Sequence, residues 1–200
     1  MLVSNSGENS GVIADTINGD IYITQAMKRK IPSLLPKFIE VLARQYTSGN
    51  TSKRIVNNQP YGIEEKISYN YIMLYRKTIE ENYIYYYICE KSLESLRHID
   101  ENSKMNILED IHEIYREIKI GFWEECNSVE NPVEELKKMI KRNSDSIINK
   151  VKKEIKNRIK DSYDGEQFNE QELNMCLDIF VCYALGECKI LERPEGNVDN

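Results

Sequence analysis

Apolar residues recur with helical spacing through most of the chain after residue 30. Residues 31–46 carry the first such stripe, at Leu34, Leu35, Phe38, Ile39, Val41 and Leu42. A second periodic run extends from Ile63 to about His98, with an interruption at residues 69–71. A third starts at Asn102 or Ser103, either of which can cap a helix. The pattern predicts amphipathic helices joined by short connections.

Two further helices have clear start signals. Asn131 is a capping residue followed by Pro132, which suits the first helical position. One helix is expected from there to about residue 160, with an apolar stripe at Val133, Leu136, Ile140, Ile147, Ile148, Val151, Ile155 and Ile159. Asn169 caps the last helix, which Pro194 and Gly196 end. Its inward side is predicted at Leu173, Cys176, Leu177, Phe180, Val181, Ala184 and Cys188.

The first 24 residues follow a different period. Two short β-branched runs, around Val12–Ile13 and Ile21–Ile23, flank Asn18-Gly19, a strong turn pair. An isolated hairpin of two short strands is marginally stable, so these strands need a partner. Copies from several chains can associate, or the segment can dock on its own body or stay unstructured. We favour self-association, through Val12, Ile13, Ile17, Ile21 and Ile23.

These patterns predict a mainly α-helical protein, in which a helical bundle follows a short Gly/Asn-rich β-strand head. The expected divisions of the chain are a head with the first helix, a Gly/Ser/Asn-rich linker, the bundle and a tail. Their boundaries are 1–46, 47–60, 61–194 and 195–200.

Composition places this chain among soluble, cytoplasmic proteins. Of its 200 residues 40% are hydrophobic, which is enough for a core. No apolar run approaches the 18 or so residues of a membrane span, and the first residues do not resemble a signal peptide. Five cysteines without a CxxC pair favour a reducing compartment.

Catalytic and metal chemistry find little support in the sequence. The two histidines, His98 and His112, lie in separate predicted helices. Glu109 and His112 form a single Glu-x-x-His match, whereas a di-iron bundle needs two. No phosphate-binding loop, dinucleotide fingerprint or nucleophile elbow occurs. We therefore expect no enzyme activity, no metal and no cofactor, and we interpret the cysteines as small buried hydrophobic residues.

One segment is strongly basic in an otherwise acidic protein. The net charge is −6, yet residues 137–160 hold 10 basic groups against two acidic ones. The solvated face of a helix explains this pattern most simply. A nucleic-acid contact or an acidic protein partner, using residues such as Lys150 and Lys153, remains open, although no aromatic base readers stand beside the lysines in the sequence.

The chain is rich in tyrosine, with 13 in all. A dense group stands at Tyr83, Tyr85, Tyr86 and Tyr87. One helical stripe cannot hold the whole group, so we expect helix packing together with an interface, while a purely internal role stays open.

Three stretches resemble a known family in order and spacing. They are PSLLPKFIEVL (32–42), GIEEKISYNYIMLYRKTIEE (62–81) and CLDIFVCYALGECKILERP (176–194). They are similar to a helical component of bacterial ABC-three-component conflict systems, and NSGVIADTINGDIYI resembles the strand segments that often precede it. The family's usual Asp-Ala-Phe is replaced by Tyr183, Ala184 and Leu185, so no role of that Asp carries over. The ending Cys188 to Glu192 and Pro194 matches.

The resemblance implies a non-enzymatic adaptor in anti-phage defence. Such a component connects an ABC-type ATPase to an effector by protein–protein binding and self-association. The alternatives are a nucleic-acid-binding module that uses residues 137–160 and an inhibitor that binds a host protein through the tyrosine-rich face.

Overall fold

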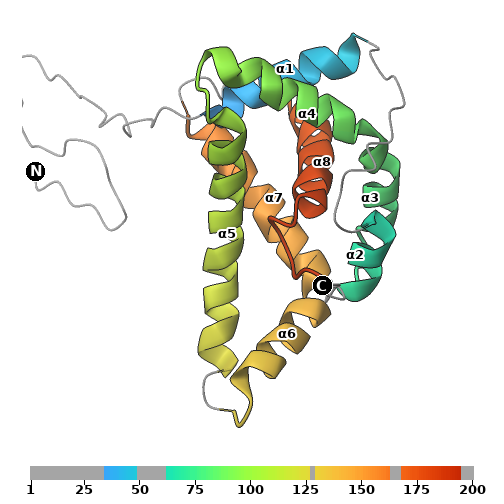
Figure 1. Cartoon of the computed structure of the whole chain (residues 1–200), viewed down its shortest axis with the longest axis vertical. Coiled ribbons are helices and arrows are strands. Elements are labelled where there is room, and N and C mark those ends of the chain that lie inside the picture. Colours follow the sequence, from blue (N-terminus) through green and yellow to red (C-terminus); the bar gives the residue numbers. More distant parts are fainter. Residues whose placement is uncertain (1–33, 49–61, 127–128, 163–167, 195–200) are drawn as a thin grey trace, which may run out of the picture. The chain divides into compact units, whose positions relative to one another are not determined.

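The computed structural model describes residues 34–48, 62–126, 129–162 and 168–194, and these ranges contain no strand. The prediction of a mainly helical chain is confirmed there. The predicted strand head lies outside the described residues, and so does the predicted linker at 47–60 apart from its first two residues. None of the helices in these ranges is long and apolar enough to cross a membrane. Figure 1 shows how the helices are arranged.

From α2 to the start of α5, and from α6 to α7, the helices follow one another with short connections (Figure 1). In chain order they are α1 (Leu34–Thr47), α2 (Ile63–Tyr69), α3 (Arg76–Asn82), the short 3₁₀ turn η1 (Tyr83–Tyr85), α4 (Tyr86–Ser95), the 3₁₀ turn η2 (Leu96–His98), α5 (Ser103–Cys126), α6 (Pro132–Arg142), α7 (Ser144–Lys160) and α8 (Glu170–Gly186).

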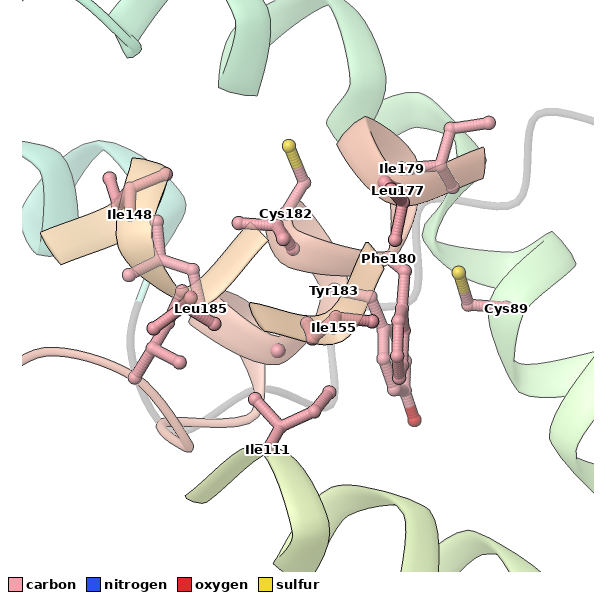
Figure 2. Close-up of a cluster of buried hydrophobic side chains, with 14 of the residues drawn as sticks. Cys89, Ile111, Ile148, Ile155, Leu177, Ile179, Phe180, Cys182, Tyr183 and Leu185 are labelled. Atoms are coloured by element: carbon pink, nitrogen blue, oxygen red, sulfur yellow. The ribbon is translucent and has the colours of Figure 1, made fainter. Parts of the chain in front are cut away.

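Helix α8 is the centre of the bundle. It contacts α1, α2, α3, α4 and α7. Every residue from Ile179 to Gly186 is buried, because that stretch has no charged side chain and is apolar on all sides. Figure 2 shows Phe180 and Leu185 of this helix with Ile155 of α7 and Ile111 of α5 in the core.

Helix α1 packs into the same core. It contacts α4 and α8, and the Phe38 ring lies 4.4 Å from the Phe180 ring, measured between centroids. The sequence had grouped this helix with the head in residues 1–46. The contacts place it in one compact unit with α2–α8, because its apolar stripe is buried against those helices.

The predicted caps of two helices are confirmed. The Asn131 side chain accepts a hydrogen bond from the Glu134 N–H, and the Asn169 side chain accepts one from the Glu172 N–H. Each satisfies one of the N–H groups left unpaired in the first turn of a helix.

The continuous helix expected from Asn131 to about residue 160 is wrong. Asn143 separates α6 from α7, and its side chain donates to the Met139 carbonyl at 2.8 Å. Asn, Ser and Asp stand together at 143–145, and their short polar side chains favour helix ends. The apolar stripe keeps its phase across this break, which hides it, and Val133 at the start of the stripe is exposed.

The last helix ends earlier than expected. It stops at Gly186, not near Pro194, and Cys188 lies beyond it with a positive φ of 55°. The N–H of Lys189 bonds to the Ala184 carbonyl at 2.9 Å, and that of Cys188 to the Leu185 carbonyl at 3.1 Å. These bonds form a Schellman cap, in which a non-glycine residue takes the left-handed position.

Candidate interaction surface

Helix α2 is fastened to the end of α8 by a buried lysine. Lys66 is 1% exposed. Its Nζ donates to the Leu185 carbonyl at 3.2 Å and also to the Gly186 carbonyl. These carbonyls are at the negative end of the α8 dipole, where an ammonium is stabilised. The short α2 thereby takes a defined position next to residues 187–194.

A buried asparagine continues this attachment. The Asn70 amide brackets Glu192: Oδ1 accepts from the Glu192 N–H at 3.0 Å, and Nδ2 donates to the Glu192 carbonyl at 2.9 Å. The side chain therefore pairs with the backbone as a neighbouring strand would. The chain at Asn70 is fixed in place where α2 ends.

The next residue turns the chain outward. Tyr71 has a φ of 54°, and the Ile72 N–H bonds back to the Ile67 carbonyl at 3.1 Å. A left-handed conformation costs a non-glycine residue about 1–2 kcal/mol. Leu191, which precedes Glu192, has a φ of 61°. The two strained residues thus flank the Asn70–Glu192 contact, and such clustering is typical of functional sites.

Asp145 fixes the other side of this loop. Its carboxylate accepts from the Met73 N–H at 3.1 Å and from the Tyr75 N–H at 2.9 Å. We call residues 71–75 the docking loop. Its backbone is fastened on both sides, yet Met73 is 78% exposed and Leu74 is 83% exposed. The molecule therefore presents two adjacent apolar side chains to solvent on a fixed backbone.

A groove borders the docking loop. It has a volume of about 410 Å³. Its walls, which we call the basic groove, are Tyr69, Tyr71, Glu134, Lys137, Lys138, Lys141 and Arg142. The Lys141 ammonium lies 3.6 Å from the centroid of the Tyr69 ring and 5.5 Å from that of the Tyr71 ring. α2 and α6 thus bring two aromatic rings next to a cluster of cations.

Several cations of the basic groove lie near carboxylates of their own helix. Lys138 and Arg142 lie 3.6 and 3.9 Å from the Glu135 carboxylate, and Lys137 lies 3.4 Å from that of Glu134. Ion pairs between exposed side chains contribute little free energy and exchange readily with other anions. The groove lining holds four cationic side chains and one carboxylate, that of Glu134.

The predicted tyrosine cluster lies elsewhere, between α4 and its neighbours. The Tyr86 ring is buried 4.6 Å from the Tyr183 ring, and its hydroxyl donates to Glu187. The Tyr85 ring lies 5.0 Å from that of Tyr46, and Tyr83 packs on the core, so both take part in internal packing. Tyr87 is half-buried, with the Lys91 ammonium 4.7 Å from its ring centroid.

The two predicted lysines stand on the exposed side of α7. Lys150 and Lys153 are both exposed, and the Lys150 ammonium lies 5.6 Å from the Phe122 ring centroid. The predicted oligomerisation residues lie outside the described part of the chain, namely Val12, Ile13, Ile17, Ile21 and Ile23.

Most of the other cations of α7 pair with acids of α8. Lys152 lies 2.5 Å from Asp178, and Lys156 lies 2.5 Å from Glu170, which also pairs with Lys160. Hydrogen bonds from Lys156 and Lys160 lower the pKa of Glu170 to about 2. The basic segment therefore divides in two: three lysines of α7 pair with acids of α8, whereas α6 faces the groove.

Four of the five cysteines are buried as expected, whereas Cys188, which was also predicted to face inward, is half-buried. Cys89, Cys126, Cys176 and Cys182 are free and buried. Burial raises the pKa of both the Cys176 and the Cys182 thiol to about 12, so these thiols stay protonated at neutral pH. Within the described ranges, no three His, Cys, Asp or Glu side chains gather in a way that could hold a metal ion.

The segment CKILERP, which follows α8, is held on α5 by its glutamate. The Glu192 carboxylate accepts from the Tyr115 hydroxyl at 2.7 Å and from Lys119 Nζ at 2.6 Å. The His112 Nδ1 lies 3.0 Å from the Lys189 carbonyl and donates to it. Burial opposes the charge on Glu192, but the hydrogen bonds from Lys119 and Tyr115 outweigh it and lower the pKa.

We expect Glu192 to make folding stability depend on pH. A carboxyl whose pKa is lower in the folded state stabilises the fold above its unfolded pKa of about 4.3, and that stabilisation is lost as the pH falls through the folded value. Urea unfolding at pH 7 and pH 3 should therefore show a smaller loss of stability for Glu192→Gln than for the wild type. Equal losses in the two proteins would contradict this role.

The docking loop and the groove were missed at the sequence level. Residues 69–71 were interpreted only as an interruption of a helical run. The available signal was the short apolar run Tyr71–Leu74 directly after Asn70. Four consecutive apolar residues do not fit the spacing of an amphipathic helix. The pairing of Tyr69 and Tyr71 with α6 had no local signal.

Comparisons with protein-family models, curated proteins and solved structures find no match to this chain.

Proposed function

We propose that the protein is a non-enzymatic adaptor or regulatory subunit that binds another protein through its docking loop. The observation that carries this proposal is the exposure of Met73 and Leu74 on a backbone held by Asp145. Adjacent exposed apolar side chains on a fixed support are typical of protein interaction sites.

The energetics suit an interface. Burying one Met or Leu side chain contributes about 1.5–3 kcal/mol. A backbone that is already ordered loses little conformational entropy on binding, so more of this free energy appears as affinity. Methionine also adapts its shape to a partner surface.

The resemblance supplies the biological setting of this proposal. It implies a conflict system directed against phage, with an ABC-type ATPase or an effector as the partner, and the cysteine content favours the cytoplasm. Self-association through the N-terminal strands belongs to the same proposal and concerns residues outside the described part of the chain.

We expect Met73→Asp with Leu74→Asp to weaken partner binding at least tenfold, because two apolar anchors of about 2 kcal/mol or more are replaced by charges. The measurement is co-purification and titration calorimetry with an ABC-type ATPase encoded by a neighbouring gene. The matched control is Met105→Asp with Ile120→Asp, which changes two exposed apolar residues of α5.

The outcomes separate two parts of the proposal. A folded double variant that binds as tightly as the wild type would exclude the docking loop as the contact. A wild-type protein that does not bind the ATPase would remove that partner and leave the effector to be tested in the same way.

A further inference from the structure

We infer that the basic groove binds a nucleotide phosphate, presented either by a free nucleotide or by a single strand of nucleic acid. This inference goes beyond the proposed adaptor function and uses different residues from the apolar pair Met73 and Leu74. It starts from the groove of about 410 Å³ in which two tyrosines meet the basic side of α6.

The first argument is charge. Lys137, Lys138, Lys141 and Arg142 bring four cations to one short helix, against the two carboxylates Glu134 and Glu135. The net charge of this helix is therefore +2, in a chain of net charge −6. Arginine and lysine are the usual phosphate ligands, and a concentrated positive patch attracts anions locally even on an acidic protein.

The second argument is the pair of aromatic rings. Tyr71 is 64% exposed, so its ring is accessible from the groove. The Lys141 ammonium lies within cation–π distance of both tyrosine rings, which holds the cation and the rings in one wall. Stacking of a base on an aromatic side chain contributes about 1–3 kcal/mol, whichever base is presented.

The third argument sets the size of the ligand. A volume of about 410 Å³ lies within the usual range for small-molecule sites. Three lysines of α7 that could extend a phosphate track pair with α8, as Lys152 does with Asp178. The footprint is therefore one or two nucleotides, which suits a nucleotide or a short single strand better than a long duplex.

The aromatic rings also favour a nucleotide over an acidic peptide. Carboxylates would use the cations alone and leave Tyr71 without a role, whereas a nucleotide uses the cations for its phosphate and the ring for its base. An acidic peptide is therefore the competing ligand in the experiment.

The experiment measures fluorescence anisotropy of a labelled eight-residue oligothymidine with the full-length protein, with ATP, a DNA duplex and polyglutamate as competitors. We expect Lys138→Glu with Arg142→Glu to weaken binding at least tenfold. Tyr71→Ala should weaken it about fivefold or more through the lost stacking, and Tyr71→Phe should restore it. The matched control is Lys150→Glu with Lys153→Glu, the same change of charge on α7.

Salt and the competitors distinguish the sources. The logarithm of the affinity should fall against the logarithm of the salt concentration with a slope of about −0.7 for each phosphate contacted on a single strand. If ATP displaces the labelled oligothymidine at concentrations similar to those of the unlabelled strand, a free nucleotide is sufficient for binding. If only the unlabelled strand displaces it, the ligand is a single strand of nucleic acid.

Three results would overturn the inference. The first is that the wild type binds neither the oligothymidine nor ATP. The second is that the α7 control loses as much affinity as the Lys138→Glu, Arg142→Glu variant. The third is that polyglutamate displaces the oligothymidine and Tyr71→Ala does not change the affinity for polyglutamate. The last result would assign the groove to acidic peptides. Protein binding by Met73 and Leu74 is measured separately, so neither hypothesis depends on the outcome of the other.

Discussion

Phe180→Ala should reduce the free energy of unfolding by about 3–5 kcal/mol, the usual effect of deleting a large core side chain. Phe180 is fully buried in α8, the helix that most of the others contact. Its ring packs on that of Phe38 with centroids 4.4 Å apart, so the substitution also removes an aromatic contact of α1. Surrounding helices cannot close the cavity without moving several elements at once.

Urea unfolding followed by circular dichroism measures this effect. Ile120→Ala is the control, because it removes an exposed apolar side chain of α5 and should change stability by less than about 0.5 kcal/mol. A Phe180→Ala protein as stable as that control would show that α8 is not the centre of the core.

Asn70→Ala should destabilise the protein by about 2–3 kcal/mol, because it leaves the N–H and the carbonyl of Glu192 without their partners. Hydrogen exchange at the backbone N–H of Glu192 should also become faster, because that N–H no longer has its hydrogen-bond acceptor. Asn70→Asp keeps the acceptor and removes the donor, so it should have an intermediate effect.

The control for this substitution is Asn157→Ala on the exposed side of α7. Unfolding by urea, with hydrogen exchange read by mass spectrometry, compares the three variants. Unchanged protection of residues 187–194 in Asn70→Ala would mean that the amide does not hold that segment.

Local signals in the sequence predicted most of the helices. Asn131 and Asn169 were identified as caps because a capping side chain bonds within its own first turn. The apolar stripes of α1, α5 and α8 were also predicted from local information, because the helical spacing of apolar residues indicates which side of a helix is buried. The family resemblance is not tested by any of these contacts and stays a prediction.

What the sequence did not predict depends on contacts between distant residues. The end of α8 at Gly186 involves Lys66, 120 positions earlier in the chain. The neutralisation of α7 needs the acids of α8 to lie beside it, and the basic groove needs α2 to lie beside α6. No periodicity within one segment carries this information.

The bond between Asn70 and Glu192 spans 122 positions of the chain, and this separation has a consequence for biosynthesis. A ribosome adds residues in order, so α2 is synthesised long before the segment that fixes its end. The bonds that fix Asn70, directly before the loop, can form only when Glu192 has left the ribosome. A chain that stops before Glu192 therefore lacks one of the two attachments of the loop, and a partner that requires both would engage finished chains alone.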